Sequence, residues 1–178
     1  GDHQLLIQCK HTLIFSEKDD NFNDVIKAFW KDFNRPTFNR ERDRLIIVKQ
    51  RLNNLEKNHI KGVLSFAKTH DSYIDFLREV NRIKEKKNRF NLFSTVLKAA
   101  NDDVKVSHQE IWEFLKVLDV LGYDFGEPAS VDESNILNLI QLAKSNSTSA
   151  NSREIWASVV EMVAKLNPSG GSVTFKSL

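Results

Sequence analysis

The chain has 178 residues, of which 26 are Lys or Arg, 24 are Asp or Glu and 40% are hydrophobic. This composition is typical of globular proteins and excludes a wholly disordered chain or a collagen-like fibre. No apolar run reaches the roughly 18 residues of a membrane span, and one cysteine, Cys9, leaves no internal disulfide. We therefore expect a cytoplasmic protein that does not enter a membrane.

Both ends of the sequence fall within segments that are typical of strands. The chain begins at Gly1 without a methionine and enters an apolar run at residues 5–7. It ends shortly after a second strand-like run at 170–175. Because natural domains seldom begin or end inside an element, we expect this sequence to be a piece of a longer protein.

The first 51 residues predict a strand, a helix and a second strand. Residues 5–10 are apolar at first and polar at the end, as in a strand that leaves a sheet. Residues 21–33 carry apolar side chains at helical spacing, with Asn21 or Asn23 as the expected cap. Residues 44–48 form a short β-branched run, which indicates a buried strand. Parallel pairing of the two strands would require a right-handed crossover.

After Gln50 all predicted elements are helices. They cover residues 52–68, 73–83, 90–97, 107–121, 132–142 and 153–166. Ser107 and Glu110 have the spacing of a capping box, and Gly122 is placed to end that helix. Trp112 and Trp156 are expected in the core. The sequence thus predicts a mixed α and β fold, with an α/β segment at 1–51 and a mainly helical region at 52–178.

Charge is distributed unevenly along the chain. Residues 1–100 carry a net charge of +7, and residues 101–178 carry −5. A basic first half favours a polyanion such as double-stranded DNA as partner. The candidate nucleic-acid-binding residues are Arg35, Arg40, Arg42, Arg44, Lys49 and Arg51. A second basic cluster at 78–89 is equally consistent with a solvated helix surface.

Gln8 and Lys10 are the residues that we single out for chemistry. The sequence has no Gly-rich phosphate loop and no His/Cys ligand cluster. Strand alternation places Gln8 and Lys10 on one face, at the end of a buried strand, with Cys9 on the opposite face as a small core residue. A Gln oxygen can orient a metal-bound water, and a Lys can stabilise charge on a phosphate. On spacing alone, a strand end that reaches solvent is the favoured interpretation.

The chain resembles the second half of a nuclease domain of the PD-(D/E)xK, restriction-endonuclease-like superfamily. The resemblance is carried by residues 6–11 (LIQCKH), 22–26, 29–33 and 43–45. It is strongest to bacterial anti-phage effectors, in which Gln-x-Lys commonly replaces Glu-x-Lys and a helical linker leads to an ATPase of the NACHT or STAND kind. Residues 118–120, 123–125, 154–160 and 170–174 are similar to such a linker.

This resemblance implies a metal-dependent DNA endonuclease with Mg²⁺ as cofactor. By position, Gln8 would be the metal-site residue and Lys10 the catalytic lysine. The acidic metal ligand of the preceding strand has no clear counterpart, since Asp2 lies only six residues before Gln8. A hard cation needs more anionic oxygens than these residues offer. We therefore expect the intact parent to cleave DNA and this chain alone to be inactive.

Two other functions compete with this one. A non-catalytic helical module for protein interaction or oligomerisation would use the acidic half at 101–178 to contact a partner, and Lys10→Ala would change nothing. A sequence-specific DNA-binding domain is the third alternative, but the sequence shows no recognisable recognition helix.

Overall fold

The computed structural model describes residues 4–10, 12–122, 137, 151 and 153–154. The chain divides into two compact units, Gly1–Tyr123 and Asp124–Leu178, and the elements below all belong to the first. The helices predicted over 132–142 and 153–166 lie, apart from positions 137, 153 and 154, outside the described residues. Asp2 and Trp156 lie outside them too.

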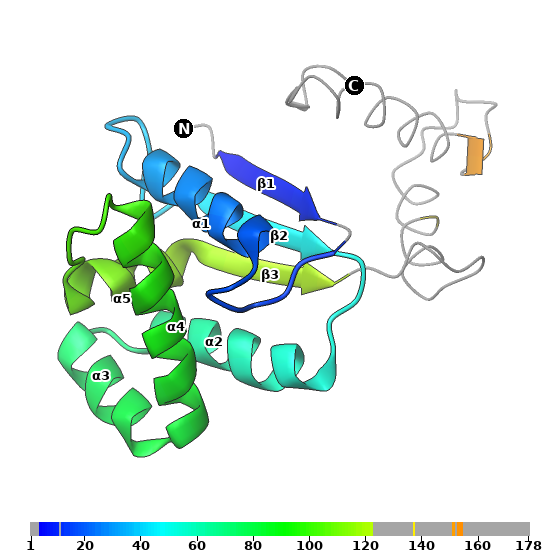
Figure 1. Cartoon of the computed structure of the whole chain (residues 1–178). Helices are drawn as coiled ribbons and strands as arrows, with labels where there is room; N and C mark the ends of the chain where they lie inside the picture. Colours follow the sequence, from blue (N-terminus) through cyan, green and yellow to red (C-terminus); the bar gives the residue numbers. More distant parts are fainter. Residues whose placement is uncertain (1–3, 11, 123–136, 138–150, 152, 155–178) are drawn as a thin grey trace. The chain divides into compact units, whose positions relative to one another are not determined.

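A parallel sheet forms the centre of the described unit. Its strands are β1 (Leu5–Lys10), β2 (Arg44–Lys49) and β3 (Leu118–Gly122), in the order β1-β2-β3. Helix α1 (Asp20–Phe33) forms the crossover between β1 and β2 (Figure 1). The mixed α and β fold is therefore confirmed, and within the part of the chain described here β1 lies at an edge of the sheet.

A helical excursion separates β2 from β3. It contains the π-helical segment η1 (Glu56–Ile60), α2 (Lys61–Thr69), α3 (Tyr73–Arg82), α4 (Lys84–Ala100) and α5 (His108–Val117). Helix α4 packs against α1, and α2 packs against both α5 and β3. Since these helices pack on the sheet itself, the compact unit runs past the predicted division at residue 51 and continues to Tyr123.

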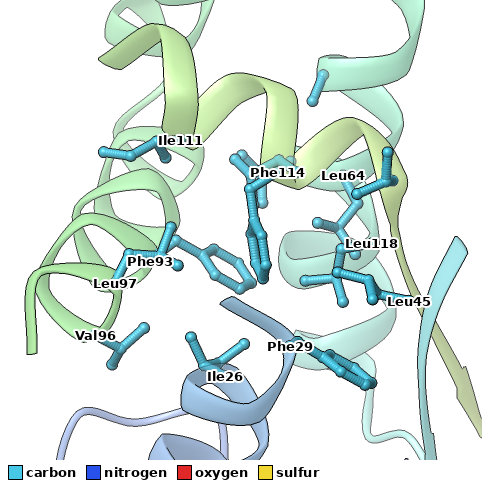
Figure 2. Packing of buried hydrophobic residues seen from close by; sticks show 14 of the residues in the cluster. Ile26, Phe29, Leu45, Leu64, Phe93, Val96, Leu97, Ile111, Phe114 and Leu118 are labelled. Carbon is cyan, nitrogen blue, oxygen red and sulfur yellow. The ribbon is translucent and has the colours of Figure 1, made fainter. Parts of the chain in front are cut away.

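The core lies between one face of the sheet and these helices. Leu45, Ile47 and Leu118 are completely buried. They belong to one hydrophobic cluster with Phe29, Phe93 and Phe114 of the helices, and Figure 2 shows most of these residues. Alternate strand residues have the opposite environment, because side chains of a strand point to its two faces in turn. Leu5 and Ile7 of β1 are each 52% exposed. The described helices thus bury one face of the sheet.

The helix predicted through Leu121 ends earlier, at Val117, and this prediction was wrong for residues 118–121. These residues form β3, with Leu118 beside Leu45 and Val120 beside Ile47 in the parallel register. Gly122 ends this strand rather than a helix, and a Cβ there would lie 2.6 Å from Cγ of Leu52. Close packing against Leu52 therefore explains the glycine.

Helix caps were predicted with mixed success. Ser107 and Glu110 form the capping box expected for α5, and Ser72 caps α3. Helix α1 instead uses Asp19, whose Oδ1 accepts a hydrogen bond from the Phe22 backbone N–H at 2.7 Å. The expectation of a cap at Asn21 or Asn23 was wrong because α1 begins at Asp20, before either residue.

Candidate functional site

Gln8 and Lys10 lie on the side of β1 that faces the helices. Exposed and half-buried residues alternate along β1, and both of these side chains are half-buried. Their partners in the parallel register are the buried Ile47 and Lys49 of β2, whose side chains therefore share this face. Cys9 is exposed on the other face, so its expected place in the core was wrong. The described helices do not bury that face.

The pair also lies near the carboxyl edge of the sheet. Lys10 is the last residue of β1, Lys49 the last of β2 and Gly122 the last of β3. Open α/β sheets bind ligands outside the carboxyl ends of their parallel strands, at the point where the strand order reverses. Gln8 and Lys10 lie at this edge of the sheet, but the described strands, in the order β1-β2-β3, contain no such reversal.

A buried ion pair lies beside Lys10. The Lys49 ammonium donates to Oε1 of Glu56 at 2.7 Å and to the carbonyl oxygen of Leu13 at 2.8 Å. The Lys49 and Glu56 side chains are only 12% and 8% exposed. Two of the three N–H bonds of Lys49 are thus used inside the chain.

Glu56 is held by the start of its own helical segment. Its Oε2 accepts a hydrogen bond from the Asn53 backbone N–H at 2.9 Å. In return, Oδ1 of Asn53 accepts one from the Glu56 N–H at 2.9 Å. This reciprocal pair fixes the carboxylate that receives Lys49. The sequence analysis missed Glu56, although Asn53 and Glu56 have the three-residue spacing of a capping box.

The described part of the chain contains no group of three or more His, Cys, Asp or Glu side chains that could hold a metal ion. Gln8 offers one neutral oxygen, and the Glu56 carboxylate already receives Lys49 and Asn53. Mg²⁺ in proteins is usually bound by one or two carboxylates together with waters and substrate phosphates. Asp2, the other metal ligand expected from the sequence, lies outside the described residues.

The basic segment at 35–51 is divided between the two edges of the sheet. Arg35, Arg40 and Arg42 precede β2, and Arg44 is its first residue, whereas Lys49 and Arg51 lie at its carboxyl end. The two ends of this six-residue strand are about 16 Å apart. Four of the six candidate DNA-binding residues therefore lie at the edge opposite to the end of β1 that carries Lys10.

Most of the arginines at that edge make contacts within the chain. Arg35 pairs with Asp32 at 2.9 Å, and Arg44 donates to the carbonyl oxygens of Glu41 and Asp43 at 3.2 and 2.7 Å. Arg42 is exposed.

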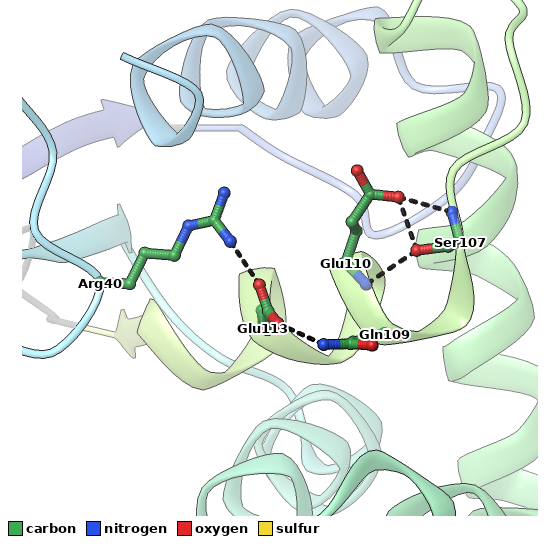
Figure 3. Close-up of polar contacts among 5 residues, drawn as sticks. All are labelled: Arg40, Ser107, Gln109, Glu110 and Glu113. Atoms are coloured by element: carbon green, nitrogen blue, oxygen red, sulfur yellow. Dashed lines mark hydrogen bonds and ion pairs between the residues drawn. The ribbon is translucent and has the colours of Figure 1, made fainter. Parts of the chain in front are cut away.

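Arg40 connects the loop before β2 to helix α5. Its guanidinium pairs with Glu113 and lies 4.2 Å from the centre of the Phe33 ring. Glu113 also accepts a hydrogen bond from the Gln109 side chain, as Figure 3 shows. Arg40 is still 46% exposed, so part of its guanidinium remains accessible to solvent.

The second basic cluster, at 78–89, forms ion pairs on helix α3. Arg78 pairs with Asp75 and Arg82 with Glu79, each at a spacing of three residues. Lys86 of α4 lies 3.0 Å from the centre of the Phe66 ring. These contacts favour the solvated-helix interpretation of this cluster.

Comparison with known proteins identifies no family for this chain. No protein-family model matches it, and neither the curated proteins nor the solved structures searched contain a match. Among the described residues, no helix is both long and apolar enough to cross a membrane.

Proposed function

We propose that this chain is part of a metal-dependent DNA endonuclease of the bacterial anti-phage effector kind. The observation that carries the proposal is the position of Gln8 and Lys10. Both side chains lie on the helix-facing side of β1, close to the carboxyl edge of a parallel sheet. A phosphodiester at this edge would be within reach of a cation and of a polar oxygen from the same strand.

Each residue has a distinct role in this proposal. The Lys10 ammonium stabilises the negative charge that grows on the phosphate as the bond to oxygen breaks. The Gln8 carbonyl oxygen orients the attacking water. The proposal requires carboxylate ligands for Mg²⁺ from outside the described residues, because Gln8 contributes no negative charge.

Double-stranded DNA is the proposed partner. The edge of the sheet next to Arg42 and the carboxyl edge that carries Lys10 are about 16 Å apart, which is close to the length of five base pairs of duplex at about 3.4 Å each. Arg42 is exposed, and Lys10 is half-buried. Lys49 is not one of these contacts, because its ammonium binds Glu56 and the Leu13 carbonyl oxygen. Phosphate contacts at both edges would orient the duplex without reading its sequence.

The test is cleavage of supercoiled plasmid DNA by the full-length protein in the presence of Mg²⁺ or Mn²⁺. Lys10→Ala is expected to abolish cleavage, since it removes the charge that stabilises the transition state. Lys27→Ala is the matched control, because Lys27 is an exposed lysine on helix α1. EDTA is expected to stop the wild-type reaction.

Equal cleavage by Lys10→Ala and wild type would contradict the assigned role of Lys10. Absence of cleavage by the wild type under all metal and nucleotide conditions would reject the nuclease. In that case the non-catalytic interaction module becomes the better description, and Gln8 and Lys10 are the polar end of a strand.

A further inference from the structure

Lys10 has a second lysine as its immediate neighbour in the sheet. Lys10 and Lys49 are partners in the parallel register, and their side chains leave the same face. Like charges directly opposite each other on a sheet are destabilising. The repulsion is stronger where water is largely excluded, and the Lys49 side chain is only 12% exposed.

Glu56 offsets the charge of Lys49. Its carboxylate is 2.7 Å from the Lys49 ammonium and is itself fixed by the backbone N–H of Asn53. The carbonyl oxygen of Leu13 accepts a further hydrogen bond from the same ammonium. Together these two acceptors hold the ammonium of Lys49 in a fixed place, and the carboxylate offsets its charge.

We propose that Glu56 is a positioning residue for Lys10. By pairing with Lys49, it keeps the neighbouring cation from displacing Lys10 and from competing with it for the phosphate. This inference rests on the proposed nuclease function and assigns a role to a residue outside the Gln-x-Lys strand. Glu56 acts through Lys49 and does not itself touch the substrate.

The decisive experiment compares Glu56→Gln with the double variant Lys49→Met, Glu56→Gln in the full-length protein. Glu56→Gln leaves Lys49 charged and without its carboxylate partner, so we expect kcat for plasmid cleavage to fall by at least about tenfold with a smaller change in KM. The double variant removes both charges. Replacement of a buried ion pair by apolar groups is often tolerated, so we expect it to recover most of the lost kcat.

A purely structural role for Glu56 predicts a different pattern. The loss of kcat in Glu56→Gln would then follow the fraction of unfolded protein, because removal of one partner of a buried ion pair is strongly destabilising. Thermal unfolding measures the folded fraction of each variant. A loss of kcat that this fraction accounts for would overturn the inference, and so would a double variant that is no more active than Glu56→Gln. Glu79→Gln is the control, because it makes the same substitution in an exposed ion pair on helix α3.

A second readout does not depend on nuclease activity. Lysine amines are labelled with ¹³C-methyl groups in the folded protein, and the Lys10 signal is assigned by its loss in Lys10→Arg. We expect this signal to move in Glu56→Gln and to return toward its wild-type position in the double variant. An unmoved Lys10 signal in Glu56→Gln would overturn the inference. If no variant cleaves DNA, the nuclease function fails, and the Lys10 signal still decides whether Glu56 positions Lys10.

Discussion

Gln8 presents a neutral amide at the position where a carboxylate would bind a divalent cation more tightly. Its side chain is half-buried, and its partner in the parallel register is the buried Ile47. In the proposed nuclease, this amide contributes an oxygen but no charge, so the affinity for Mg²⁺ depends on the remaining ligands.

Substitution of this residue by a carboxylate is therefore a direct test at the residue scale. We expect Gln8→Glu to lower the Mg²⁺ concentration that gives half-maximal cleavage, because the added negative charge attracts the cation. Gln8→Ala should raise it or abolish cleavage. The measurement is the cleavage rate of the full-length protein as a function of Mg²⁺ concentration.

Gln50→Glu provides the control for charge alone. It adds the same charge one residue after β2, outside the alternation that places Gln8 and Lys10 together. A similar gain in Mg²⁺ sensitivity from Gln50→Glu would show that net charge, and not ligation by residue 8, causes the effect.

Part of this site was predictable from the sequence, and part was not. Strand alternation placed Gln8 and Lys10 on one face, and the burial along β1 agrees with it. Alternation alone does not say which face of the strand is covered by helices. Cys9 was therefore predicted in the core, whereas it is exposed. The Lys49–Glu56 pair depends on the register of β1 and β2 and on the path of the chain after Asn53, which no local pattern reveals.

At the scale of single elements, helix α5 depends on a charged cap. The Ser107 hydroxyl is 2.6 Å from Oε2 of Glu110, and the Ser107 backbone N–H donates to the same oxygen at 3.0 Å (Figure 3). The hydrogen bond from the Ser107 side chain, aided by the one from its backbone, holds the pKa of Glu110 below its ordinary value of 4.5. Because folding lowers the pKa of Glu110, its ionised carboxylate stabilises the protein at pH values above the ordinary pKa. This stabilisation is lost as the pH falls through the lowered pKa of the folded protein.

We therefore expect a pH-dependent effect of Ser107→Ala. At pH 7 the substitution should lower the free energy of unfolding by about 1 kcal/mol. As the pH falls below 4.5 and through the lowered pKa of Glu110, the difference from wild type should shrink, since a protonated Glu110 accepts these bonds more weakly. Urea denaturation at several pH values measures it.

Ser65→Ala is the control for this experiment, because Ser65 is exposed within helix α2 and has no capping position. Its effect should not vary with pH. A difference between Ser107→Ala and wild type that stays constant down to pH 3 would contradict the assigned role of the Glu110 carboxylate.

Elements with a clear period were predicted well, and β3 was not. The apolar residues Leu118 and Leu121 continue the helical spacing of α5, and a segment of only five residues fits a helix end as well as a strand. The choice is made by pairing: Leu118 and Val120 fill the core face of the sheet beside Leu45 and Ile47. A contact with a strand some 70 residues earlier in the chain cannot be read from a local window.

At the scale of the whole molecule, the basic side chains before β2 and at the end of β1 predict salt-sensitive binding of DNA. Each phosphate contact releases counterions, so the slope of log K against log salt reports the number of contacts. We expect Arg42→Ala to reduce the magnitude of this slope by about one and to weaken binding equally for unrelated duplexes. Fluorescence anisotropy of a labelled duplex at several salt concentrations measures both quantities.

Lys98→Ala is the comparison for this test, since Lys98 is exposed on helix α4 and lies outside both basic clusters. If Arg42→Ala left the slope of log K against log salt unchanged, Arg42 in the loop before β2 would not contact the DNA. A loss confined to one DNA sequence would instead favour the sequence-specific binding domain.

The long helical segment between β2 and β3 also has a consequence for folding during synthesis on the ribosome. The chain must be synthesised through residue 122 before the third strand can pair with β2. Until then Leu45 and Ile47 lack their β3 neighbours, and the nascent chain exposes apolar surface that can associate wrongly. Slow translation just before residue 118 would prolong this period. A chaperone that binds the emerging helices would reduce wrong association while it lasts.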